Sequence, residues 1–170
     1  MHLNVEIKAR SKQNDRIRSI LQSKNADYRG VDHQVDTYFH NDNGRLKLRR
    51  GNIEHNLIFY RRPDQAGPKT SEVFLYQPNP GPELYELLKA AYGIWREVKK
   101  AREIYFIDNV KFHLDEVEGL GSFVEIEAID FEGSLGKPYL QKQCDAYISL
   151  LEIKEVDLIE ESYSDLIGRM

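Results

Sequence analysis

The stretch GSFVEIEAID, Gly121 to Asp130, decides the fold. Successive side chains of an extended chain point to opposite faces, so Glu125 and Glu127 share one face of this segment. The other face carries the small or branched apolar side chains of Val124, Ile126 and Ala128. The segment is therefore predicted to be a strand that lies between a polar and an apolar environment.

The N-terminal stretch MHLNVEIKAR, residues 1–10, repeats this arrangement. Glu6 and Lys8 lie on its polar face, and apolar residues fill most of the alternate positions. If the two polar faces meet, Glu6, Glu125 and Glu127 supply three carboxylates, which are ligands that Mg²⁺ and Mn²⁺ prefer. The remaining strands must decide whether the faces meet.

Length and composition narrow the class of protein. A chain of 170 residues is long enough for one domain with a sizeable core, and we expect a single domain over 1–170. The net charge of −4, from 24 Lys and Arg against 28 Asp and Glu, argues against a general nucleic-acid binder. The single cysteine, Cys144, fits a reducing compartment, and no apolar run approaches the roughly 20 residues of a membrane span. We expect a cytoplasmic protein without a membrane partner.

Hydrophobic periodicity and turn signals predict about eight strands and four helices. Strands are expected near residues 2–9, 27–40, 45–50, 56–62, 72–77, 95–107, 110–117 and 122–131. Helices are expected near residues 11–24, 83–92, 135–151 and from about 162, where Ser162 and Asp165 resemble a capping box. The stretch 62–71 is expected to be a loop. Turn signals at 108–109 and 118–121 join the last three strands into an antiparallel meander.

Charged side chains are segregated on the polar faces of these strands. Acidic residues gather at positions 6, 115, 125 and 127, and basic residues at 45–49, 61 and 100–102. These faces can be the solvent side of an ordinary antiparallel sheet. Alternatively, the sheet curls so that the polar faces point inward and form a tunnel. The scarcity of Thr, Ser and Gln favours the tunnel, whose arginines and cation-binding carboxylates suit a polyphosphate.

A series of motifs in chain order identifies a family resemblance. They are Asn4-x-Glu6-x-Lys8, VDTYF (35–39) with GRLKLR (44–49), FYRRPD (59–64) with Lys69 and Ser71, KKAREIYFI (99–107), HLDEVEGLGSFVEIE (113–127) and SYSDLI (162–167). Over nearly its whole length the chain resembles the CYTH superfamily, which includes class IV adenylyl cyclases, thiamine triphosphatases and inorganic triphosphatases. The resemblance implies an α+β fold, an eight-stranded antiparallel β-barrel called a triphosphate tunnel, with helices packed outside. The segment 113–127 and the tail are most similar to the cyclase branch.

The resemblance also implies roles for matching positions. Residues expected to hold Mg²⁺ or Mn²⁺ are Glu6, Asp115, Glu125 and Glu127. Residues expected to bind the triphosphate are Lys8, Arg45, Lys47, Arg49, Arg61, Lys69, Lys100 and Arg102. Glu6, Lys8 and Asp115 are expected to take part in catalysis. The expected partner is a triphosphorylated small molecule, ATP first, with no nucleic acid and with a homodimer possible.

Three functions remain open at this point. A class IV adenylyl cyclase would convert ATP to cyclic AMP and pyrophosphate. A triphosphatase would hydrolyse tripolyphosphate, thiamine triphosphate or a nucleoside triphosphate in the same tunnel. A non-catalytic protein would only bind phosphorylated metabolites.

Two features qualify this interpretation. Asn4 stands where the family has its first glutamate, so the substitution is either tolerated in an outer ligand or weakens cation binding and catalysis. The histidines at 33, 40, 55 and 113 lack metal-ligand spacing to one another, and we expect them to have surface or structural roles.

Overall fold

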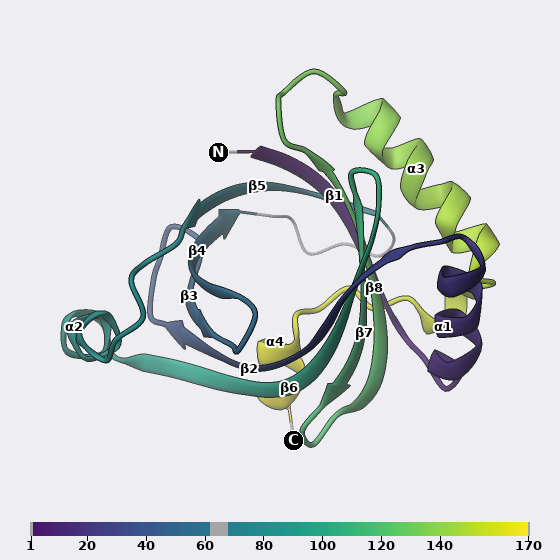
Figure 1. The fold of residues 1–170 in the computed structure, drawn as a ribbon. Helices are drawn as coiled ribbons and strands as arrows, with labels where there is room; N and C mark the ends of the chain where they lie inside the picture. Colours follow the sequence, from purple (N-terminus) through teal and green to yellow (C-terminus); the bar gives the residue numbers. More distant parts are fainter. Residues whose placement is uncertain (1, 62–67, 170) are drawn as a thin grey trace.

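The computed structural model describes residues 2–61 and 68–169, and its strands close into one antiparallel barrel (Figure 1). The strands are β1 (His2–Arg10), β2 (Asp27–Phe39), β3 (Arg45–Arg50), β4 (His55–Arg61), β5 (Lys69–Tyr76), β6 (Ile94–Ile107), β7 (Val110–Val117) and β8 (Gly121–Asp130). Around the barrel they follow the order β1-β5-β4-β3-β2-β6-β7-β8. The expected eight-stranded barrel is confirmed.

The meander β6-β7-β8 forms as the turn signals predict, and β1 closes the barrel against β8. In the β1–β8 register Glu6 lies opposite Glu127, and Lys8 lies opposite Glu125. The polar faces of the two stretches that suggested the fold therefore do meet, and they meet inside the barrel.

Among the described residues, three helices lie outside the barrel and the fourth and shortest covers one of its ends. They are α1 (Asn14–Ser23), α2 (Glu83–Tyr92), α3 (Lys137–Leu150) and α4 (Tyr163–Ile167), with one 3-10 turn at Glu155–Asp157. Figure 1 shows α1 and α3 together on one side, where they contact β8, while α2 stands at the opposite side near β2. None of the helices described in residues 2–61 and 68–169 is long and apolar enough to cross a membrane.

The main hydrophobic core lies outside the barrel lumen, between the strands β1, β7 and β8 and the helices α1 and α3. Ile7, Phe112 and Ile126 point outward from the strands and pack with Leu21 and Leu140 of the helices. Burying large side chains of this kind stabilises the fold by about 2 kcal/mol each. Because the apolar faces are used outside, the polar faces of the same strands are left to line the lumen.

Two predicted boundaries are corrected by pairing between distant strands. β5 begins at Lys69 and not at residue 72, because residues 69–73 pair with β1. Of the loop predicted at 62–71, the part at 62–67 lies outside the described residues. α1 begins at Asn14 and not at Ser11, because the Ser11 backbone N–H donates to the Ser122 carbonyl at 3.1 Å and continues the sheet contact.

Candidate active site

The lumen encloses a cavity of about 230 Å³. Among the described residues, six basic side chains line it: Lys8, Lys47, Arg49, Lys100, Arg102 and Lys111. Five carboxylates line it as well: Glu6, Asp36, Glu54, Glu125 and Glu127. Strand alternation delivers ten of these groups from six different strands, and Glu54 comes from the turn between β3 and β4, so no short segment of sequence contains the site.

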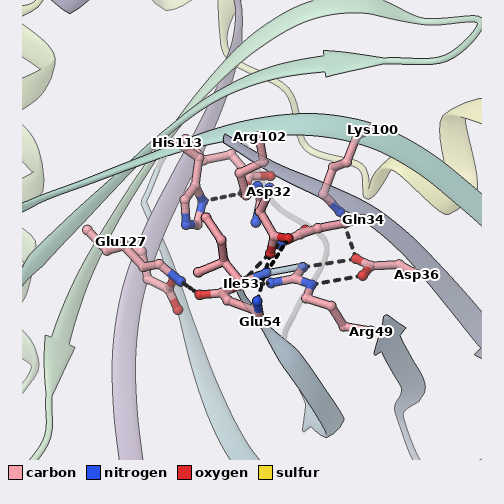
Figure 2. A network of polar contacts seen from close by, with 12 residues as sticks. Asp32, Gln34, Asp36, Arg49, Ile53, Glu54, Lys100, Arg102, His113 and Glu127 are labelled. Atoms are coloured by element: carbon pink, nitrogen blue, oxygen red, sulfur yellow. Dashed lines mark hydrogen bonds and ion pairs between the residues drawn. The ribbon is translucent and has the colours of Figure 1, made fainter. Parts of the chain in front are cut away.

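Asp36 is the centre of a basic cluster on β2, β3 and β6 (Figure 2). Its carboxylate accepts two hydrogen bonds from Arg49, at 2.8 and 2.9 Å, and contacts the ammonium groups of Lys100 at 2.8 Å and Lys47 at 3.0 Å. Burial alone would raise the pKa of Asp36, but these three cations hold it well below its ordinary value. Asp36 is therefore the ionised hub that keeps three cations together in the lumen wall.

Lys100 is the basic group most affected by this environment. Burial lowers its pKa to about 7, and the nearby charges of Arg102, Arg49 and Lys47 add to the effect while Asp36 opposes it. Its charge therefore changes near neutral pH, unlike that of an ordinary lysine.

A second cluster surrounds Arg102 on β6. Its guanidinium donates to both oxygens of Asp115 at 2.7 and 2.6 Å and to Glu125 at 2.7 Å. The Tyr163 hydroxyl of α4 donates to the same Asp115 carboxylate at 2.7 Å. Asp115 is fully buried behind the lumen wall, where its two oxygens hold Arg102 and Tyr163 in place.

Glu125 joins this cluster to β1 and β7. Lys8 lies 3.1 Å from one of its oxygens, and the Nδ1 of His113 lies 3.1 Å from the other. Burial and the charges of Arg102 and Lys111 lower the pKa of His113 to about 3, so its ring is neutral. A carboxylate only accepts, so Nδ1 carries the hydrogen and the buried Nε2 presents a lone pair, without a partner among the described residues.

Glu6, Glu125 and Glu127 form an acidic stripe along β1 and β8, and the pKa of Glu127 is shifted in the direction opposite to that of Glu125. Burial raises the pKa of Glu127, and the neighbouring charges of Glu6 and Glu125 add to this while Lys111 opposes it. Asn4 donates its amide N–H to Glu127, and its own Oδ1 is buried without a hydrogen-bond partner in the described part of the chain. An orphaned amide oxygen beside mutually repelling carboxylates is an arrangement that an oxygen-ligated cation would satisfy.

The chemistry of the residues at this stripe therefore fits a divalent cation, but their oxygen atoms do not converge on one point. Within residues 2–61 and 68–169, no three His, Cys, Asp or Glu side chains are arranged to hold a metal ion. Glu125 forms ion pairs with Lys8 and Arg102. The oxygen atoms that we would assign to a bound cation are those of Glu6, Glu127 and the Asn4 amide.

Comparison with known proteins identifies the family of this barrel. A family model described as the CYTH domain matches residues 2–163. The chain belongs to the CYTH family. Proteins of this family are generally enzymes that act on triphosphates with divalent metal ions. No curated protein matches the sequence significantly.

Several solved structures share the CYTH fold of this chain. The PH1012 protein from Pyrococcus horikoshii is 25% identical, with a TM-score of 0.73 over 98% of this chain and 99% of that one. A candidate adenylate cyclase from Vibrio parahaemolyticus is 18% identical, with a TM-score of 0.75 over 98% of both chains. A candidate adenylyl cyclase from Hippeastrum with a dominant triphosphatase activity is 15% identical, with a TM-score of 0.63 over 98% of this chain and 94% of that one.

Three residues expected to bind the triphosphate do not line the lumen of this CYTH domain. Arg61 is exposed on the outer face of β4, because Ile58 and Tyr60 take the inward positions. Arg45 lies at the barrel end covered by α4 and pairs with Asp165 at 2.8 Å. Lys69 shares the lumen-facing row of β5, but its ammonium donates to the main-chain oxygens of residues 159 and 160 in the tail.

Among the lumen residues that the sequence did not predict as site residues, the ones that form ion pairs in the described part of the chain are Asp36, Glu54, Lys111 and His113. His113 is not at the surface, which was one of the two roles expected for it, because its ring is buried and lines the lumen. The available signal for Lys111 and His113 was their spacing, four and two residues before Asp115, which places all three on one face of the same strand. Glu54 lies between the strands expected at 45–50 and 56–62, and strand periodicity gives no signal there.

Proposed function

We propose that this CYTH protein is a class IV-type adenylyl cyclase, which converts ATP to cyclic AMP and pyrophosphate with the help of Mg²⁺ or Mn²⁺. The observation that carries the proposal is the composition of the lumen. It combines basic side chains that suit a phosphate, an acidic stripe that suits a divalent cation, and apolar side chains at the end where β1 begins, which we call the apolar mouth.

The charge balance of the lumen supports a dependence on divalent cations. The basic side chains that line it barely outnumber the carboxylates. A triphosphate brings several further negative charges, which would remain uncompensated in a low-dielectric site. Binding the substrate together with a divalent cation at Glu6, Glu127 and the Asn4 oxygen removes this imbalance.

The apolar mouth supports an organic triphosphate over an inorganic one. Five apolar side chains line the lumen at the end where β1 begins: Ile58, Val73, Leu75, Ile129 and Phe131. Inorganic tripolyphosphate offers nothing to bury against these side chains, whereas a purine base buries a flat apolar face. We infer that the base of ATP lies at this mouth, with the phosphates directed towards Arg49, Lys100 and Arg102.

In the proposed reaction the ribose 3′-oxygen forms a bond to the α-phosphorus, and the bond to the bridging oxygen breaks as pyrophosphate leaves. The proton of the 3′-hydroxyl passes to a carboxylate of the acidic stripe. Lys8, Lys100 and Arg102 hold the phosphates and balance the charge that builds on the departing pyrophosphate. A bound divalent cation supplies Lewis-acid activation and further charge compensation.

A triphosphatase is the second candidate, and the Hippeastrum structure with its dominant triphosphatase activity is the observation in its favour. Water would then attack the γ-phosphorus in place of the ribose hydroxyl. The same cations serve either reaction, since only the nucleophile and the attacked phosphorus differ.

Product identification separates these functions. The purified protein is incubated with ATP or tripolyphosphate plus Mg²⁺ or Mn²⁺, and the products are identified by chromatography. Cyclic AMP with pyrophosphate is the expected result, and orthophosphate from either substrate would establish the triphosphatase instead. Binding without any turnover would overturn both and indicate a non-catalytic protein. Glu127→Gln should abolish turnover, whereas Glu118→Gln, on an exposed turn, should not.

A further inference from the structure

The hairpin turn between β3 and β4 folds back and places a carboxylate in the lumen. The turn is closed by a hydrogen bond from the Gly51 N–H to the Glu54 carbonyl at 2.9 Å. The Glu54 side chain points inward and lines the cavity together with residues of the surrounding strands (Figure 2). A turn that joins two neighbouring strands has no need of a buried acidic side chain.

The position of this turn is fixed by a buried polar anchor. Asp32 is fully buried on β2, and its carboxylate accepts hydrogen bonds from the backbone N–H groups of Ile53 at 2.8 Å and Glu54 at 2.9 Å. Gln34 donates to Asp32 at 2.7 Å and to Glu54 Oε2 at 3.2 Å. A Cβ at Gly51 would clash with the Asp32 carboxylate, so the tight approach requires glycine there.

Glu54 spans the lumen between two cations on separate strands. Its Oε2 accepts a hydrogen bond from Arg49 of β3 at 2.8 Å, and its Oε1 accepts from Lys111 of β7. The strands β2 and β6 lie between β3 and β7 in the barrel. Burial alone would raise the pKa of Glu54, but Arg49 and Lys111 hold it well below its ordinary value. The group is therefore an ionised carboxylate fixed across the tunnel.

Arg49 does not need Glu54 as a counter-charge. Asp36 already pairs with it through two hydrogen bonds. Burying another ionised carboxylate costs desolvation energy that an ion pair returns only in part. Ion pairing with Arg49 therefore does not explain the placement of Glu54, whose other partner, Lys111, is a second lumen cation.

We propose that Glu54 acts as a built-in anion that occupies the position of one phosphate group between Arg49 and Lys111, and so limits the length of the phosphate chain that the tunnel accepts. This inference rests on the proposed function, in which phosphates occupy the lumen. It makes Glu54 a specificity-determining residue for a triphosphate against longer chains.

The test measures the binding of pyrophosphate, tripolyphosphate and tetrapolyphosphate by calorimetry in the presence of a metal chelator. Wild type is compared with Glu54→Gln and with Glu97→Gln. Glu97 is a matched control because it also forms an ion pair, with Arg50 at 3.4 Å, but on the outside of the barrel. Glu54→Gln should bind tripolyphosphate about tenfold more tightly, because one repelling charge is removed. Its affinity for tetrapolyphosphate should rise further, and Glu97→Gln should match wild type.

Unchanged or weaker binding by Glu54→Gln, or an unchanged preference among chain lengths, would overturn the role of Glu54. The measurement is repeated with Mg²⁺ in place of the chelator. If wild type binds none of the three phosphates under either condition, the proposed function of the lumen fails as well, so the two failures are distinguishable. Should Glu54→Gln not fold, Glu54→Asp keeps the charge but withdraws it from Lys111 by one methylene. The affinity of Glu54→Asp for tripolyphosphate and tetrapolyphosphate should then rise by less than that expected for Glu54→Gln. Wild-type affinities for all three phosphates in Glu54→Asp would overturn the inference.

Discussion

At the scale of single residues, one carboxylate, Asp36, is the shared ion-pair partner of three lumen cations. Asp36→Asn removes the shared ionised partner of Arg49, Lys100 and Lys47, and leaving these buried cations without it should cost roughly 3–5 kcal/mol of unfolding free energy. Thermal or denaturant unfolding measures this loss. Asp27→Asn is the control, because its ion pair with Arg29 is exposed and should contribute at most about 1 kcal/mol.

Tripolyphosphate gives the Asp36 prediction a second measurement. Millimolar tripolyphosphate should raise the melting temperature of Asp36→Asn by more than it raises that of wild type, because phosphate replaces the lost anion. Equal shifts in both proteins would contradict this account of the cluster.

The lowered pKa of Lys100 predicts a pH-dependent affinity for phosphate. Below pH 7 Lys100 is charged in the folded protein, and above pH 7 it becomes neutral while an unfolded lysine stays charged to about pH 10. Its buried charge therefore destabilises the fold most below pH 7, and this cost is relieved progressively as pH rises from about 7 to about 10. Phosphate affinity changes in the opposite direction.

The affinity for tripolyphosphate should therefore be weaker at pH 8 than at pH 6, relative to Lys100→Arg, whose guanidinium stays charged throughout. Isothermal titration at several pH values measures both proteins. Because Lys100→Arg stays charged, the pH dependence of its affinity reports the titration of tripolyphosphate itself. If the affinities of the two proteins changed with pH in parallel, the assigned pKa of Lys100 would be refuted.

At the scale of elements, the short helix α4 depends on its N-terminal cap. The Ser162 hydroxyl accepts from the Asp165 backbone N–H at 3.2 Å, and the Asp165 side chain accepts in return from the Ser162 backbone. α4 in turn positions Tyr163 against Asp115. The predicted capping box is confirmed, and it connects a five-residue helix to the wall of the lumen.

Ser162→Ala should weaken α4 by about 1 kcal/mol, because the Asp165 backbone N–H loses its side-chain acceptor. Amide hydrogen exchange over residues 163–167 should accelerate roughly fivefold, with little change in the strands. Ser149→Ala is a suitable control, since Ser149 lies inside α3 and bonds only the carbonyl of its preceding turn. Equal exchange in wild type and Ser162→Ala would show that tertiary contacts alone hold α4.

At the scale of the whole molecule, the lumen links stability to divalent cations. Mg²⁺ or Mn²⁺ added with tripolyphosphate should raise the melting temperature of wild type beyond the effect of tripolyphosphate alone. Glu127→Gln should lose this extra shift. Without cations it should be at least as stable as wild type, because a neutral amide suits the environment that raises the pKa of Glu127.

Differential scanning calorimetry measures both effects, with Glu118→Gln as the control. A Glu127→Gln protein that keeps the full cation-dependent shift would remove Glu127 from the proposed ligand set.

The sequence was informative wherever a strand had one polar and one apolar face. The alternation in β1, β6 and β8 predicted both the barrel and the inward direction of Glu6, Lys100, Arg102 and Glu125. It failed in β4, where inward Ile58 and outward Phe59 are equally apolar, and the direction of Arg61 was therefore assigned to the wrong side. Periodicity carries no information about a face when both faces are apolar.

What the sequence by itself determined was the barrel, the family and the charged character of the lumen, because local periodicity and ordered motifs encode them. Only the tertiary structure decided which charges meet. It joined Asp36 to cations from β3 and β6, and it brought Glu54 from a turn to Lys111 of β7. The physical reason is that the closed barrel sets the pairing of strands far apart in the chain, and the energy of a charge depends on the neighbours that this pairing supplies.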